Sequence, residues 1–177
     1  MSIKIDLRNQ VRQTNLPKWK PLLPLFETVI NSFQAIGDAN PKKTGSVTVE
    51  LERETPLLTE ENPKIIGFKV IDDGVGLNDD NFDSFNTAFS PHRMQVGGKG
   101  LGRFVWLKAF VRAEITSIFA DGDTLLRRNF VFDENYDLDD RGLPEATTTG
   151  AAGTVVHLIG YRDPYRGECP RSADVIV

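Results

Sequence analysis

The sequence predicts a two-layer α/β domain, in which helices cover a sheet that contains at least one antiparallel hairpin. Three observations favour this class. Segments rich in β-branched residues recur between residues 45 and 160, and one long segment has its apolar residues at helical spacing. An Asp-Gly pair, a strong hairpin signal, separates two of the strand-like segments. A chain of 177 residues is long enough to bury a core of its own.

The first regular element is expected to be a helix that begins near Pro21 or Pro24, because proline is tolerated in a first helical turn. Its apolar residues fall on one face: Leu22, Phe26, Val29, Ile30, Phe33 and Ile36. Gly37 and Pro41 supply a stop signal. Residues 1–18 are interpreted as an irregular N-terminal arm.

Five segments are predicted to form strands: 45–53, 64–72, 112–120, 123–133 and 153–160. The first alternates apolar and polar residues and is expected to pair antiparallel with the second. Asp121 and Gly122 join the third and fourth segments as a hairpin. Residues 78–96 are polar and irregular, and residues 100–111 are a glycine loop that opens a helix.

Composition excludes several classes of protein. The formal net charge of −4 gives no general basic surface for nucleic acid. A single cysteine, Cys169, rules out an internal disulfide framework and a multi-cysteine metal site, and we expect it to be an inert thiol. The two histidines, His92 and His157, are interpreted as an exposed loop residue and a structural strand residue. No apolar run is long enough to span a bilayer and no signal-peptide core is present, so a soluble, cytoplasmic protein without a membrane partner is expected.

The first of three motifs lies on the long predicted helix. Glu27 and Asn31 are four residues apart and share a face, and Gln34 lies on the same stripe. This stripe borders the apolar face, so it is placed at the edge of the core, where a cleft would form. Taken alone, these residues also fit the polar face of an amphipathic helix.

The second motif follows a predicted strand. Asp72 ends that strand and is followed by Asp73, Gly74 and Gly76. Taken alone it fits an Asp-Gly turn. A carboxylate at the end of a buried strand can also accept a hydrogen bond from an exocyclic amine, and flanking glycines let a flat ring approach the backbone. That chemistry suits adenine.

The third motif is a glycine loop before a helix that is expected to start near Leu101. Its glycines are Gly97, Gly98, Gly100 and Gly102. Main-chain N–H groups at a helix N-terminus form an anion site, and phosphate is its usual occupant. Lys99 and Arg103 would add positive charge. The loop is neither a P-loop nor a dinucleotide fingerprint, because neither spacing occurs.

In this order the three motifs, with the late Gly-Thr strand at residues 153–158, resemble the GHKL ATPase superfamily of gyrase, heat-shock chaperones, histidine kinases and MutL. The match covers roughly residues 20–160. The resemblance implies the Bergerat ATP-binding fold, a two-layer sandwich of a mixed, mostly antiparallel sheet with helices on one face. It also implies ATP and Mg²⁺ as ligands, and a single ATP-binding domain over residues 1–177.

The resemblance also assigns roles by position. Asn31 matches the asparagine that coordinates Mg²⁺, and Glu27 the acid that activates the attacking water. Asp72 would accept from the adenine amino group beside Thr154, with Gly74 and Gly76 on the adenine side.

The phosphates and the lid complete the expected site. The residues expected around the phosphates are Gly98, Lys99, Gly100, Leu101, Gly102 and Arg103. Residues 78–97 would form the ATP lid, whose Phe82, Phe85 and Phe89 are expected to pack on the core and not to contact substrate.

The expected function is Mg²⁺-dependent ATP hydrolysis that acts as a conformational switch, with nucleotide-dependent homodimerisation in a longer protein of which this chain is the N-terminal part. Two departures from the family pattern are visible: Gln34 stands where many members carry aspartate, and Asp73 where asparagine or threonine is common. Two alternatives remain open, namely the catalytic domain of a histidine kinase and an ATP-binding interaction module without hydrolysis. The pathway and the effector or client stay undetermined.

Overall fold

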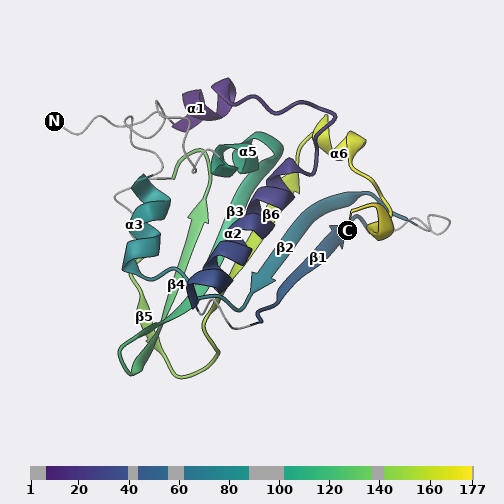
Figure 1. Ribbon diagram of the computed structural model, residues 1–177. Coiled ribbons are helices and arrows are strands. Elements are labelled where there is room, and N and C mark those ends of the chain that lie inside the picture. The colour runs from purple at the N-terminus through teal and green to yellow at the C-terminus, as the bar shows by residue number, and fades with distance from the viewer. Residues whose placement is uncertain (1–6, 40–43, 56–61, 88–101, 137–141, 177) are drawn as a thin grey trace.

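The computed structural model describes residues 7–39, 44–55, 62–87, 102–136 and 142–176. It has α/β architecture, with a six-stranded sheet and helices packed over one of its faces (Figure 1). The two-layer α/β class predicted from the sequence is therefore confirmed.

The sheet has the order β1-β2-β6-β3-β4-β5. Its strands are β1 (Val47–Arg53), β2 (Ile65–Asp72), β3 (Phe110–Asp121), β4 (Thr124–Phe132), β5 (Glu145–Thr147) and β6 (Gly153–Tyr161). Every neighbouring pair of described strands is antiparallel, so the expectation of a mixed sheet is wrong for this part of the chain. The reason is the place of β6: this late strand lies between β2 and β3 and runs antiparallel to both.

The five strands predicted from the sequence are all present, and β1 pairs with β2 as expected. The hairpin between β3 and β4 also forms: Asp121 pairs with Thr124, and Gly122 between them has a φ of 58°, which favours glycine. Strand β5 was not predicted, because three residues are too few to show an alternating pattern.

The helices are α1 (Leu7–Gln13), α2 (Leu23–Ala39), α3 (Asp79–Thr87), α5 (Gly102–Ala109) and α6 (Tyr165–Glu168), with a 3-10 turn η1 (Ala173–Val175). The prediction of an irregular N-terminal arm is wrong for α1, which is a helix with Leu7 and Val11 buried. The ammonium of Lys108 on α5 donates to the carbonyl of Arg12, at 3.0 Å, and holds α1 against the domain. None of the helices in the described ranges is long and apolar enough to cross a membrane.

The long helix α2 buries a different face from the one predicted. Its buried residues are Pro24, Leu25, Thr28 and Ser32, whereas Phe26, Ile30 and Phe33 are exposed. Small side chains face the sheet because the Thr28 hydroxyl donates to the Pro24 carbonyl and Ser32 bonds a strand residue, so their polar atoms are satisfied without water. The helix also continues through Gly37 and ends at Ala39.

The expectation of an irregular segment is wrong for residues 79–87, which form α3. The Asn78 side chain caps this helix by accepting the N–H of Asn81 at 2.9 Å. Phe82 and Phe85 are buried, as predicted, and Phe85 meets Phe130 edge-on with ring centroids 5.3 Å apart. Phe89 lies outside the described residues.

The core lies between the helices and one face of the sheet. Phe68 of β2, Leu158 of β6 and Ala113 of β3 are fully buried there, beneath Phe104 of α5. On the opposite face His157 lies 2.7 Å from the Glu52 carboxylate, which agrees with its predicted structural role.

Candidate functional site

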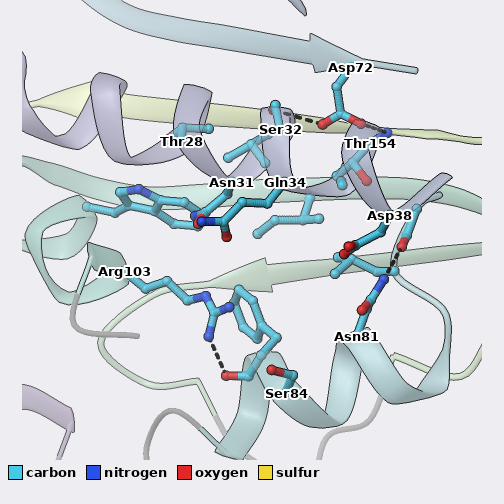
Figure 2. Close-up of a pocket in the computed structure, with 17 residues that line it drawn as sticks. Thr28, Asn31, Ser32, Gln34, Asp38, Asp72, Asn81, Ser84, Arg103 and Thr154 are labelled. Carbon is cyan, nitrogen blue, oxygen red and sulfur yellow. Dashed lines mark hydrogen bonds between the residues drawn. The ribbon is translucent and has the colours of Figure 1, made fainter. Parts of the chain in front are cut away.

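A cavity lies between α2 and α3, with β3 and β6 as its floor and the first turns of α5 at one end. Figure 2 shows Asn31, Gln34 and Asp38 on the α2 side and Asn81 and Ser84 on the α3 side. Of the residues predicted for a ligand site, five line this cavity: Asn31, Asp72, Gly76, Arg103 and Thr154. Gln34 of the helix motif lines it too. The fold therefore brings the helix motif, the strand-end motif and the start of the glycine-led helix to one place.

Asp72 is the buried acid of this cavity, at the end of β2. Its Oδ1 accepts the N–H of Gly74 at 3.0 Å and the N–H of Thr154 at 3.2 Å, and its Oδ2 accepts the Ser32 hydroxyl at 2.8 Å. Burial raises the pKa of Asp72 above its ordinary value, while these hydrogen bonds oppose that rise.

The expected closeness of the Gly-Thr strand to Asp72 results from sheet register, because Thr154 on β6 is the pairing partner of Asp72 on β2. The Thr154 hydroxyl lies 3.0 Å from the Ser117 hydroxyl on β3, and Ser117 in turn accepts the N–H of Leu77 at 2.7 Å. This chain of bonds joins three strands and the loop after β2, so it fixes the cavity floor around Asp72.

The glycines after Asp72 are also required by the packing of the protein itself, in addition to the predicted approach of a flat ring to the backbone. A Cβ at Gly74 would lie 2.7 Å from the Ala35 backbone of α2. At Gly76 the φ is 76°, and a Cβ would lie 3.0 Å from the carbonyl carbon of Ile118 on β3 and closer still to its oxygen. Both positions require glycine because the loop passes between a helix and a strand. Gly76 still lines the cavity, whereas Gly74 does not.

Arg103 stands at the α5 end of the cavity. Its guanidinium lies 4.0 Å from the ring centroid of Phe85 and donates to the Phe85 carbonyl at 2.7 Å (Figure 2). No carboxylate in the described part of the chain pairs with it. Burial lowers the pKa of Arg103 to about 10, which leaves it charged at neutral pH. Among the described residues, a positive charge without an acid partner therefore faces the cavity.

Glu27 does not line the same cavity as Asn31. It lies in a neighbouring pocket with Gly102 of α5 and with polar residues of and after α1, among them Gln10, Gln13 and Asn15. A Cβ at Gly102 would lie 3.1 Å from the Glu27 carboxyl carbon and closer still to one oxygen, so the carboxylate rests on the first residue of α5. This is the N-terminal end of the helix, where a negative charge is favoured.

Several predicted residues lie outside the described part of the chain: Gly97, Gly98, Lys99, Gly100, Leu101, His92 and the second half of the expected lid, residues 88–97. The predicted phosphate loop is therefore represented in the structure only by Gly102 and Arg103. Cys169 is buried, and burial raises the pKa of its thiol, which agrees with the expectation of an inert group.

Sequence reasoning missed several polar residues of this region, among them three serines. Ser32 and Ser117 both belong to the Asp72 network, and Ser84 lines the cavity from α3. Ser32 follows Asn31 directly, so its position beside a motif residue was a usable signal. Ser117 had none, because a serine in a strand identifies no partner until the register is known.

Two comparisons of the sequence with known proteins give no relative. No protein-family model matches the chain, and no curated protein matches it.

Proposed function

We propose that this chain binds ATP with Mg²⁺ in the cavity beside Asp72 and hydrolyses it, as a GHKL-type domain with the Bergerat fold. The observation that supports this most is the Asp72 carboxylate, which is buried at the end of a cavity and held by three donors from Ser32, Gly74 and Thr154. Such an acceptor is suited to a neutral amine on a flat ring.

The number of free acceptor positions favours adenine over guanine. A carboxylate offers about four lone-pair positions, and the described donors occupy two on Oδ1 and one on Oδ2. One position on Oδ2 remains. The adenine amino group needs one acceptor, whereas the adjacent ring N–H and amino group of guanine suit a carboxylate with both oxygens free.

The other end of the cavity supports a bound phosphate chain. Arg103 supplies a charge without an acid partner among described residues, and the Asn31 amide, exposed in the cavity, would offer an oxygen to Mg²⁺. Among the described residues, no group of three His, Cys, Asp or Glu side chains could hold a metal ion. Asn31 would hold Mg²⁺ together with the nucleotide, and the cation would neutralise charge as it develops on the phosphates.

For hydrolysis, the Glu27 carboxylate would orient a water for attack on the terminal phosphorus, yielding ADP and inorganic phosphate. Its position at the N-terminal end of α5 supports this role, because the expected phosphate loop precedes that helix directly. Glu27 and Asn31 line adjoining pockets, so a bound triphosphate would have to extend from one to the other. Nucleotide-dependent dimerisation would then make hydrolysis a conformational switch.

Binding is tested by calorimetric titration of the wild type, Asp72→Asn and Asp73→Asn with ATP and Mg²⁺. Asp73 is the matched control, because it neighbours Asp72 and bonds Ser46 without lining the cavity. We expect Asp72→Asn to lose binding and Asp73→Asn to keep it, and GTP to bind at least about tenfold more weakly than ATP. If the wild type gives neither heat nor a melting shift with ATP, the proposal is wrong.

Hydrolysis is tested with Glu27→Ala, which we expect to bind ATP like the wild type and to release no phosphate. Equal phosphate release by this variant would remove Glu27 from the mechanism. Binding by the wild type without turnover would favour the interaction module. Labelled phosphohistidine after incubation with ATP would favour the histidine-kinase alternative.

A further inference from the structure

We propose that two amide side chains of α1, Gln10 and Gln13, position the water molecule that attacks the nucleotide. They are here called the amide pair. Both line the pocket that also contains Glu27 and Gly102, the first residue of α5. The inference rests on the proposed function, because it concerns the same hydrolysis, and it adds residues that none of the three sequence motifs contains.

The side of α1 that faces Glu27 is neutral. Gln10 and Gln13 are three residues apart, so they share one face of the helix. The two arginines of the same helix, Arg8 and Arg12, are not among the residues that line the pocket. Glu27 is therefore the one charged side chain among the described residues that line it.

Neutral amides suit the surroundings of a general base. A cation beside the Glu27 carboxylate would pair with it and occupy the lone pairs that must hold the water, and a second carboxylate would repel the phosphates. An amide offers one oxygen that accepts and one NH₂ group that donates, so it can fix the orientation of a water molecule. Orienting the attacking water is a role that neutral amide side chains can fill in phosphoryl transfer.

The segment that carries the amide pair is held in place. Figure 1 shows α1 beside α5, and Val11 of α1 is buried in the core. The Lys108 ammonium donates to the Arg12 carbonyl at 3.0 Å. Beyond the helix, the Tyr165 hydroxyl donates to the Leu16 carbonyl at 3.1 Å. These contacts fix the amide pair against the Glu27 pocket, and groups that orient a reactant must themselves be fixed.

The step is an attack by one water molecule. Its oxygen forms a bond to the terminal phosphorus, while the bond from that phosphorus to the departing ADP oxygen breaks. Glu27 takes the proton that the water loses, and the amide pair holds the water through its other hydrogen and a lone pair. The amide pair transfers no proton, so Gln10 and Gln13 are positioning residues. Their loss should lower kcat and leave the affinity for the nucleotide unchanged.

The first experiment measures phosphate release by the 177-residue chain over a range of ATP concentrations with Mg²⁺. Gln10→Met and Gln13→Met keep a side chain of similar length without the amide. Each should lower kcat at least about fivefold and leave KM and the calorimetric ATP dissociation constant unchanged. Arg12→Met is the matched control and should keep the wild-type kcat. Arg12 lies on the same helix outside the pocket, and its main-chain carbonyl still accepts from Lys108.

The second experiment places a cation beside Glu27. Gln10→Lys should lower kcat at least about tenfold, more than Gln10→Met does, because the new ammonium pairs with the carboxylate. ATP binding should be retained. Arg12→Lys is the control for this charge and should leave kcat unchanged. Circular dichroism and the melting temperature show that each variant is folded.

Three results would overturn this inference while the proposed function stands. One is a wild type that binds and hydrolyses ATP together with an unchanged kcat in Gln10→Met and Gln13→Met. Another is a rise in KM or in the ATP dissociation constant at unchanged kcat, since the amide pair would then bind the nucleotide. The third is an equal loss of kcat in Arg12→Met, which would make α1 a packing element alone. A wild type that releases no phosphate removes the proposed hydrolysis, and the inference fails with it.

Discussion

The hydroxyl of Ser32 on α2 donates to Oδ2 of Asp72 on β2 at 2.8 Å, and both residues are buried. This bond ties the long helix to the sheet at the point where the candidate cavity begins. It also explains why the helix turns a small polar face inward: a larger side chain at position 32 would leave no room for the contact and would leave the carboxylate with one donor fewer.

Asp72 should give the stability of the protein a distinct pH dependence. Burial raises its pKa above the ordinary value of 3.8, so the folded protein holds this proton more tightly than the unfolded chain does. The stabilisation from this group is therefore complete below the unfolded pKa and is lost as the pH rises through the raised folded-state pKa. Urea unfolding of the wild type and Asp72→Asn, from about pH 3.5 to about pH 7, should show the wild type losing stability relative to the variant.

The Ser32→Ala variant sharpens this test. Removal of a hydrogen bond that lowers the pKa of Asp72 should move the same loss of stability to a higher pH. It should also cost about 1 to 2 kcal/mol of unfolding free energy at neutral pH, because Asp72 remains ionised with fewer donors. A difference between wild type and Asp72→Asn that does not change with pH would contradict the assignment.

Gly102 should matter for turnover through Glu27. An added methyl group at Gly102 would collide with the Glu27 carboxylate, so Gly102→Ala should displace that side chain and slow phosphate release about tenfold or more. The measurements are phosphate release and calorimetric ATP binding for the wild type and Gly102→Ala. If the effect passes through Glu27, Gly102→Ala should slow release and leave ATP binding unchanged, as we expect for Glu27→Ala. A matching loss of ATP binding would show that Gly102 acts on the phosphates instead.

Arg128 should be a main stabilising contact of α3. It is buried, donates to the carbonyls of Leu77 and Gly142 at 3.3 and 2.9 Å, bonds Asp79 at 2.5 Å and stacks on Phe82. Arg128→Met should cost about 3 kcal/mol in urea unfolding, because two part-buried carbonyls lose their donor and the buried guanidinium contacts are lost.

Asp79→Ala is the control for Arg128. The Asp79 side chain is 84% exposed, so losing its half of the ion pair should cost less than about 1 kcal/mol. Equal costs for the two variants would mean that the ion pair, and not the carbonyl contacts, holds α3.

A comparison of Gly76 with Gly122 distinguishes the cost of placing alanine at a positive φ from the cost of a steric clash. Both have positive φ, of 76° and 58°, but a Cβ at Gly76 would meet the Ile118 backbone whereas one at Gly122 would meet nothing within 4 Å. Gly122→Ala should cost about 1 kcal/mol, and Gly76→Ala about 3 kcal/mol because a clash is added to the strain. Thermal and urea unfolding measure both, and equal costs would exclude the packing contribution.

Local pattern was sufficient for most of the sheet. Alternation in residues 45–53, the β-branched runs and the Asp121-Gly122 pair depend on neighbours along the chain, so they could be interpreted without the fold. The same holds for the motifs: Asn31 and Gln34 share a helical stripe, and Asp72 ends a strand, whatever packs against them. These motifs line one cavity because β6 pairs with β2 in the folded protein.

Sequence patterns were thus enough to predict the class of fold, five of the six described strands and part of the group of residues around Asp72. The packing of the fold was needed to show which face of α2 is buried, that residues 79–87 are a helix, and that Glu27 and Asn31 line adjoining pockets. The physical reason is that hydrophobicity records what a residue gains by burial, but not whether a partner is there to cover it. Thr28 and Ser32 are buried because specific acceptors satisfy them, and Phe26 and Phe33 are exposed because no part of the described fold reaches them.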